Sequence, residues 1–363
     1  MPLHFKPYLL DQATFKGGRA RDGDSQQKIY KLSSNENPIG ASPLAVEALT
    51  KYAPTVFEYP AATNQEFHEA LEGFYSGEII AEQFITTNSG VATIELVMRG
   101  FLEPGTEFIY SSPAFIAYRS FGERMGAMGI DVPLVGANFD LDVEGILAAV
   151  NEKTRLVLIT SPNNPTGTHM PRSRVDHLVN NLPDHVVLLF DEVYYQFADA
   201  VDYVRATPYI KEGKNVVAVN SFSKAYGLAG LRVGYAYSTS EISGYLRNLR
   251  RPFMVNTLSM KAAMAALQDE AFLRQTVQVV REGRAYLYEE LAKLGCQFWK
   301  TQANFILIRP EMTSGDFVSK MAAEYVMVRP AEGMSDSRGV RVTIGDQEAN
   351  HAFIKAFKTV MVK

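Results

Sequence analysis

Short apolar runs alternate with amphipathic segments between residues 107 and 237 of the chain. Several of the runs are apolar on both faces, which is typical of strands in a parallel sheet that helices cover. The predicted strands are 107–111, 155–160, 186–190, 215–220 and 233–237. Segments with helical spacing, such as 142–150 and 172–182, lie between them. The alternation predicts an α/β fold with a mainly parallel, doubly wound sheet, in which ligands bind at the carboxyl ends of the strands.

Helical patterns dominate on either side of this region. Before it, helices are predicted at about 42–52, 64–75 and 90–102, the first with Ser42 as its N-cap. After it, the predicted helices are 241–249, 258–267, 272–294, 315–324 and 347–361, and the predicted strands are 304–308, 326–329 and 340–344. We therefore expect a large domain at residues 45–245, a smaller α+β domain at 246–363, and an N-terminal arm, 1–44, that joins the small domain.

The composition narrows the function classes. The chain has 363 residues, of which 47% are hydrophobic, and its 36 Lys and Arg against 40 Asp and Glu leave no basic stripe for nucleic acid. The N-terminal residues lack the apolar core of a signal peptide, and no stretch approaches the roughly 20 apolar residues of a membrane span. One cysteine, Cys296, and six scattered histidines give neither disulfides nor metal-ligand spacing. We expect a cytoplasmic enzyme with no metal, no nucleic-acid partner and no membrane partner.

A carboxylate follows the apolar run 186–190 directly. Asp191 is costly to bury without a cation or a strong hydrogen-bond donor. Taken alone, it is better explained as a cap for the following turn. The functional alternative is a carboxylate that holds a positive charge on a ligand, such as a pyridinium nitrogen.

Two further polar segments follow apolar runs. Residues 220–232 bring together Ser221, Ser223, Lys224 and Arg232 among glycines, a set that suits a phosphate monoester and a nucleophilic lysine better than a solvated surface. In the segment 161–167, Asn164 lies among strong turn formers. This segment is explained equally well as a tight loop and as an amide donor to a ligand.

Together, these three segments resemble the fold-type I pyridoxal-phosphate enzymes, and among them the class I and II aminotransferases. The resemblance extends over nearly the whole chain. It is strongest to the histidinol-phosphate branch, through Leu-Ser-Ser-Asn-Glu-Asn-Pro at 32–38, Tyr-Pro at 59–60, Asn-Pro-Thr-Gly at 164–167, Asp-Glu-x-Tyr at 191–194, Ser-x-Ser-Lys at 221–224, Ala-Asn-Phe at 303–305 and Val-Arg-Val-Thr-Ile-Gly at 340–345.

The resemblance implies pyridoxal 5'-phosphate as the cofactor and a role for each matching residue. Lys224 would bind the cofactor aldehyde covalently and then carry the proton between the substrate and the cofactor. Asp191 would pair with the ring nitrogen, and Asn164 and Tyr194 would hydrogen-bond the ring oxygen. Phe115 would stack on the ring, although it is explained nearly as well as a core phenylalanine.

The implied phosphate site combines side chains with a helix N-terminus. Its members would be Ser221, Ser223 and Arg232, with backbone N–H groups of Gly90 and Val91. Tyr59 would reach the phosphate from the neighbouring subunit, which implies a homodimer with shared active sites. The alternative for Tyr59 is an ordinary buried tyrosine in a turn.

The implied substrates are a small amino donor and a 2-oxo acid. Arg341 would bind a distal anion or a carboxylate of the substrate, and Arg329 a second anion. The alternatives are a salt bridge at a sheet edge for Arg341 and a surface arginine before Pro330 for Arg329. The family's usual acidic pair is missing at 89–92, and Ala61-Ala62 replaces its usual Asp-Pro. Both changes weaken the substrate assignment.

Three hypotheses follow from the resemblance. The first is a ping-pong aminotransferase that moves an amino group to 2-oxoglutarate, with histidinol phosphate as the leading donor and an aromatic amino acid as the second. Another is a pyridoxal-phosphate-dependent decarboxylase of a phosphorylated amino acid. The last is a non-catalytic ligand-binding module of the kind fused to transcription regulators, which the absence of a basic patch disfavours.

Overall fold

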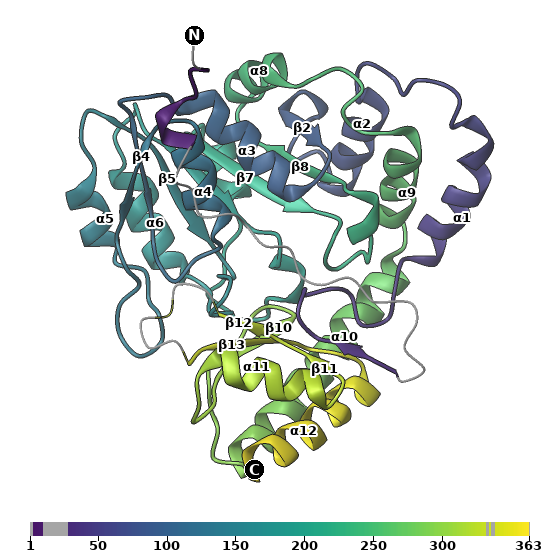
Figure 1. Cartoon of the computed structure of the whole chain (residues 1–363). Coiled ribbons are helices and arrows are strands. Elements are labelled where there is room, and N and C mark those ends of the chain that lie inside the picture. Colours follow the sequence, from purple (N-terminus) through teal and green to yellow (C-terminus); the bar gives the residue numbers. More distant parts are fainter. Residues whose placement is uncertain (1–2, 10–27, 332–333, 335–337, 363) are drawn as a thin grey trace.

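The computed structural model describes residues 3–9, 28–331, 334 and 338–362, so residues 1–2 and 10–27 of the predicted arm lie outside the described residues. A large sheet has helices on both faces, and a smaller sheet lies below it, built mainly from the C-terminal part of the chain (Figure 1). None of the helices in the described ranges is long and apolar enough to cross a bilayer.

Within the described residues, the large sheet has seven strands in the order β2-β8-β7-β6-β5-β3-β4. Their bounds are β2 (Phe84–Thr87), β3 (Glu107–Tyr110), β4 (Met128–Asp131), β5 (Thr154–Thr160), β6 (Val187–Asp191), β7 (Val216–Ser221) and β8 (Gly234–Tyr237). From β7 to β4 all neighbours are parallel, whereas β8 is antiparallel to both β7 and β2. The prediction of a mainly parallel sheet is confirmed.

Helices cover both faces of this sheet because its strands are apolar on both faces. In β6, Leu188 and Phe190 pack into one core cluster, and Val187 and Leu189 pack into the other. The first layer contains α1 (Pro43–Tyr52), α2 (Gln65–Phe74), α5 (Val143–Ala149), α6 (Arg172–Asn181), α7 (Thr207–Lys211) and α9 (Thr257–Leu267). The second contains α3 (Gly90–Phe101), α4 (Ala117–Arg124) and α8 (Ser240–Leu249). The doubly wound arrangement is therefore present.

The smaller sheet has the order β12-β13-β10-β9 and is antiparallel. Its strands are β9 (Gln297–Phe298), β10 (Phe305–Arg309), β12 (Arg329–Pro330) and β13 (Val340–Thr343), and the helices around it are α10 (Glu270–Lys293), α11 (Ser314–Ala323) and α12 (Gln347–Val362). Beside it, β1 (Tyr30–Lys31) pairs in parallel with β11 (Val326–Met327). Leu32 packs in the same core as the four-stranded sheet. The N-terminal segment therefore lies against the small sheet before the chain reaches the large one.

Short 3-10 helices connect several elements: η1 (Pro7–Leu9), η2 (Ala53–Thr55), η3 (Ala81–Gln83), η4 (Tyr195–Phe197) and η5 (Ala229–Leu231). The domain limits drawn from the sequence stay a prediction. Helix α9 lies beyond the predicted limit of residue 245, but its Met260 and Ala263 pack in the core of the large sheet. This packing favours a boundary near Glu270, where α10 begins.

The sequence pattern missed or merged some elements. It did not predict β4, whose residues are exposed or half-buried and form no apolar run, nor β2 or the polar helix α4. The single strand predicted at 326–329 is wrong, because Val328 interrupts it and the two halves, β11 and β12, belong to different sheets.

Candidate active site

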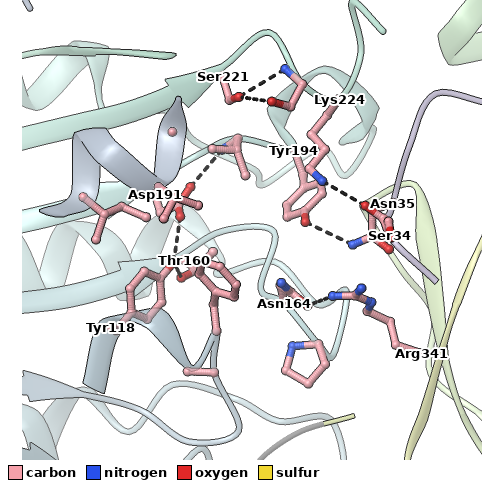
Figure 2. A pocket seen from close by; sticks show the side chains of 18 of the residues that line it. Ser34, Asn35, Tyr118, Thr160, Asn164, Asp191, Tyr194, Ser221, Lys224 and Arg341 are labelled. Carbon is pink, nitrogen blue, oxygen red and sulfur yellow. Dashed lines mark hydrogen bonds between the residues drawn. The ribbon is translucent and has the colours of Figure 1, made fainter. Parts of the chain in front are cut away.

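A cavity of about 300 Å³ lies where the carboxyl ends of β5, β6 and β7 face the small sheet. Figure 2 shows side chains from both parts of the molecule pointing into it. The residues predicted for the site line this cavity, with one exception, and they are Gly90, Val91, Phe115, Asn164, Asp191, Tyr194, Ser221, Ser223, Lys224, Arg232, Arg329 and Arg341. The exception is Tyr59, whose side chain is 86% exposed and contacts the ring of Phe253.

Asp191 is the last residue of β6, and its buried carboxylate is held from two sides. One oxygen accepts a hydrogen bond from the Tyr118 hydroxyl at 2.7 Å, and the other accepts from the backbone N–H of Val193 at 3.1 Å. The Tyr118 hydroxyl also shares a 2.6 Å hydrogen bond with Thr160 (Figure 2). Burial raises the pKa of Asp191 to about 6, although the bonds from Tyr118 and Val193 lower it. The carboxylate is thus fixed in position, and within the described ranges it forms no direct ion pair with a cationic side chain.

Lys224 follows β7 and reaches into the same cavity. Its Nζ donates to the backbone oxygen of Ser34 at 3.2 Å. Burial, together with the nearby guanidinium of Arg341, lowers the pKa of Lys224 to about 7. A substantial share of this amine is therefore neutral, and hence nucleophilic, at physiological pH.

The end of β7 lies close against the start of α3. The Ser221 hydroxyl donates to Ser223 at 2.9 Å and accepts the Ser223 backbone N–H at 3.1 Å. A Cβ at Gly90, the first residue of α3, would lie 3.1 Å from the Cβ of Ser221, so glycine permits this approach. The first N–H groups of a helix have no partner within the helix. This corner therefore offers hydroxyls, backbone donors and the cation of Arg232 to an anion.

Asn164 and Arg341 join the two sheets across the cavity. The guanidinium of Arg341 donates to the Asn164 side-chain oxygen at 2.7 Å (Figure 2). It also donates to the Ser33 backbone oxygen at 2.8 Å. The Tyr194 hydroxyl accepts a hydrogen bond from the Asn35 amide at 3.0 Å. Among the described residues, neither the Asn164 NH₂ group nor the Tyr194 hydroxyl proton has an acceptor. Both donors line the cavity.

The comparisons with known proteins agree with this arrangement. A family model for aminotransferases of class I and II matches residues 27–357. The chain belongs to this family. A histidinol-phosphate aminotransferase of Akkermansia muciniphila is 35% identical over 360 residues, which cover 98% of each chain. A relative of the same name from Moorella thermoacetica is 35% identical over 334 residues, 92% of this chain and 86% of that protein.

Solved aminotransferase structures share the fold. The histidinol-phosphate aminotransferase of Sinorhizobium meliloti, in complex with pyridoxal-5'-phosphate, has a TM-score of 0.90 at 23% identity, over 99% of this chain and 97% of that one. The aspartate aminotransferase of Thermus thermophilus with maleate has a TM-score of 0.80 at 22% identity, over 92% and 91%. The predictions of the family, the fold class and a pyridoxal-phosphate-dependent aminotransferase are confirmed.

The donor set of the cavity fits the aminotransferase cofactor. A buried carboxylate suits a ring nitrogen, two donors without acceptors suit a ring oxygen, a neutral amine suits an aldehyde, and the β7–α3 corner suits a phosphate. Several residues of the cavity had no assigned role from the sequence, and two of them, Tyr118 and Asn35, hydrogen-bond predicted site residues through their side chains. Tyr118 was assigned no role because α4 was not predicted. Its spacing of three residues from Phe115 was the available signal, because in a helical turn this spacing places two side chains nearly on the same side. Asn35 was noted only as part of a matching motif.

Proposed function

We propose that this aminotransferase takes the amino group from histidinol phosphate and passes it to 2-oxoglutarate in two alternating half-reactions. The observation that carries the proposal is the 35% identity to a histidinol-phosphate aminotransferase along 98% of both chains. The two arginines in the cavity, Arg329 and Arg341, suit a phosphorylated donor and a dicarboxylate acceptor, because both carry anions that need cations at the same end.

When bound, pyridoxal phosphate supplies an aldehyde that combines with amines and a protonated ring that accepts electrons from the substrate Cα. Lys224 would hold the cofactor by its Nζ until a substrate amine replaces it. The released amine would then accept the Cα proton and return it at the C4' atom of the cofactor, a role that suits an amine whose pKa the cofactor-free site lowers to about 7. One residue would thus serve as anchor and as acid–base group.

Asp191 would keep the ring nitrogen protonated. Its pKa of about 6 means that most of the carboxylate is ionised above that pH, and a cation placed beside it would stabilise the ionised form further. Tyr118 and Val193 hold both oxygens in position before the cofactor arrives. Phe115 borders the same cavity, and it would stack on the ring.

The remaining groups would hold the two anionic parts of the cofactor. Ser221, Ser223 and Arg232, with the N–H groups of Gly90 and Val91, would bind the phosphate. Asn164 and Tyr194 would donate to the ring oxygen, because each has a donor that lacks an acceptor among the described residues. Since Arg341 donates to the oxygen of Asn164, it would direct the Asn164 NH₂ group toward the ring.

The proposal includes a homodimer. Tyr59 lies outside its own cavity and is 86% exposed, and its neighbours Val56 and Phe57 are 67% and 82% exposed. Apolar side chains exposed together are typical of an interface. Tyr59 would reach the cofactor phosphate of the partner subunit, so that each site needs two chains. The cytoplasm as the compartment also stays a prediction.

A half-reaction screen tests the substrate. The protein is loaded with pyridoxal phosphate, and histidinol phosphate or aromatic, aliphatic and acidic amino acids are added while the visible absorbance is followed. We expect histidinol phosphate to remove the absorbance fastest and 2-oxoglutarate to restore it. Faster reaction with an aromatic amino acid would replace histidinol phosphate with the second donor candidate, and the changes at 61–62 and 89–92 would then accompany a different donor.

Borohydride treatment of the loaded protein tests the anchor. The label is expected on Lys224. A label on another residue, or a protein that takes up no pyridoxal phosphate, would refute the assignment of the site.

A further inference from the structure

Asn35 forms hydrogen bonds through both its backbone and its side chain. It is buried, with 1% exposed, and adopts a left-handed backbone conformation with φ of 53°. Its backbone N–H donates to the Thr343 hydroxyl at 2.9 Å, and its backbone oxygen accepts from the Asn304 amide at 3.1 Å. These two bonds fix the backbone of Asn35 against the small sheet. Its side chain is therefore held in one place relative to the cavity.

The network also determines which end of the Asn35 amide faces Tyr194. The Thr343 hydroxyl accepts from the Asn35 N–H, so its single proton is free to donate, and it donates to the Asn35 side-chain oxygen at 3.2 Å. The opposite end of the amide is the NH₂ group, which donates to the Tyr194 hydroxyl at 3.0 Å. Reversing the amide would leave the Thr343 proton without this acceptor.

A phenol that accepts a hydrogen bond on one side must direct its own proton elsewhere. The Tyr194 hydroxyl has one proton, and Asn35 offers it an N–H rather than an acceptor. In the described part of the chain no other group accepts this proton, and the side chain borders the cavity. The Asn35 amide thereby turns the Tyr194 proton toward the space that the cofactor ring oxygen would take.

We propose that Asn35 is a positioning residue of the reaction, acting through Tyr194: by donating to the phenol oxygen it forces Tyr194 to act as a donor to the cofactor. The inference rests on the role proposed above for Tyr194. With the cofactor bound to Lys224, a donor to the ring oxygen would reduce the negative charge on that oxygen, and this charge stabilises the protonated form of the linked nitrogen. Asn35 would therefore lower the pKa of the cofactor-linked nitrogen of Lys224.

The competing explanation is that Asn35 serves only the backbone, because asparagine tolerates φ above zero better than most residues do. Two variants separate the roles. Asn35→Gly keeps the left-handed backbone without a side chain. Asn35→Asp keeps the shape and the oxygen that faces Thr343, but it places an acceptor where the NH₂ group faces Tyr194. The Tyr194 proton would then turn toward the aspartate and away from the cofactor.

The measurement is the pH titration of the visible absorbance of the loaded protein, in the wild type and in a Tyr194→Phe background. We expect Asn35→Asp to raise the titration midpoint by about one pH unit and Asn35→Gly to raise it by less. In the Tyr194→Phe background, Asn35→Asp should change the midpoint far less, because only the through-space effect of its charge remains. Equal shifts in both backgrounds, or no shift in Asn35→Asp, would overturn the proposal.

A second measurement does not need the cofactor. In the cofactor-free protein labelled with ¹³C at the tyrosine ring, the Tyr194 Cζ signal is assigned by its loss in Tyr194→Phe. It should move in Asn35→Asp and in Asn35→Gly, because the phenol oxygen loses its donor in both. An unmoved signal would overturn the hydrogen bond itself. A moved signal in a protein that binds no pyridoxal phosphate would instead refute the proposed function and leave the Asn35–Tyr194 contact standing.

Discussion

Replacing Lys224 by methionine should stabilise the cofactor-free protein near neutral pH. Burial and the guanidinium of Arg341 lower the pKa of the amine from 10.5 to about 7, which means that folding disfavours its charged form. The unfolded chain does not have this cost. Methionine has a similar length and carries no charge, so the variant removes the cost with little change in packing.

The size of the effect follows from the pKa of the amine. Each pKa unit corresponds to about 1.4 kcal/mol, so a change from 10.5 to about 7 amounts to about 4 to 5 kcal/mol. Lys224 borders the cavity and is only partly buried, and water there reduces this value. The variant also loses the hydrogen bond to Ser34, about 1 kcal/mol. We expect a net gain of about 2 to 3 kcal/mol in the free energy of unfolding.

The gain should depend on pH with a definite sign. Below the folded-state pKa of about 7, Lys224 is charged in the folded protein, and the full free-energy cost of burying this charge is present. Above 10.5 the amine is neutral in both the folded and the unfolded protein. The charge-dependent part of the advantage of Lys224→Met should therefore shrink as the pH rises from 7 and vanish near 10.5, where only the loss of the hydrogen bond to Ser34 remains. Urea unfolding of both cofactor-free proteins between pH 6.5 and 10 measures it. Lys355→Met, at an exposed position of α12, is the matched control. A gain that does not change with pH, or a less stable Lys224→Met protein at pH 7, would refute the reasoning.

Three further predictions concern the same site. Arg232→Ala should weaken pyridoxal-phosphate binding by about 1.5 to 3 kcal/mol in equilibrium dialysis, and an unchanged affinity would remove Arg232 from the phosphate site. In the cofactor-free protein the ¹³C signal of the Asp191 carboxyl should titrate near pH 6, and at higher pH in Tyr118→Phe, which lacks the donor at 2.7 Å; an unchanged titration would contradict the contact. Subunits of Lys224→Ala mixed with subunits of Tyr59→Ala should regain activity, because a hybrid dimer has one site with both residues intact. If the activity of the mixture only equals the sum of the activities of the two variants, this result would argue against shared sites.

The sequence predicts those helices and strands whose burial produces a regular pattern of apolar residues. Strands such as β6 are apolar on both faces because helices cover both, so their runs stand out. Strand β4 lies at the sheet edge with exposed residues, and its pattern is not separable from a loop. The separation of β11 from β12 depends on partners far away in the chain, which no local pattern reports.

The site was predictable where its residues directly follow strands. Parallel strands bring their carboxyl ends to one edge, so Asn164, Asp191 and Lys224 had to meet. Residues that contact the site residues from elsewhere in the chain gave no such signal. Tyr118 reaches Asp191 from an unpredicted helix, and Asn35 reaches Tyr194 from a loop, so their roles came only from the hydrogen bonds. The matching of Tyr59 to a partner subunit rests on resemblance and stays a prediction.

The hydrogen bonds between Asn35 and Thr343 determine when the cavity can be completed during translation. These residues are 308 positions apart, and the Thr343 N–H also donates to the backbone oxygen of Leu32. At about 5 to 20 residues per second, a ribosome would need roughly 15 to 60 seconds between the two. The seven-stranded sheet is complete at Tyr237, so it has all its strands long before Arg341 and Thr343 are synthesised. In the nascent chain, Lys224 and Asp191 would thus be in place on the large sheet while the cavity still lacks its wall from the small sheet. Tight cofactor binding would begin only at the end of translation.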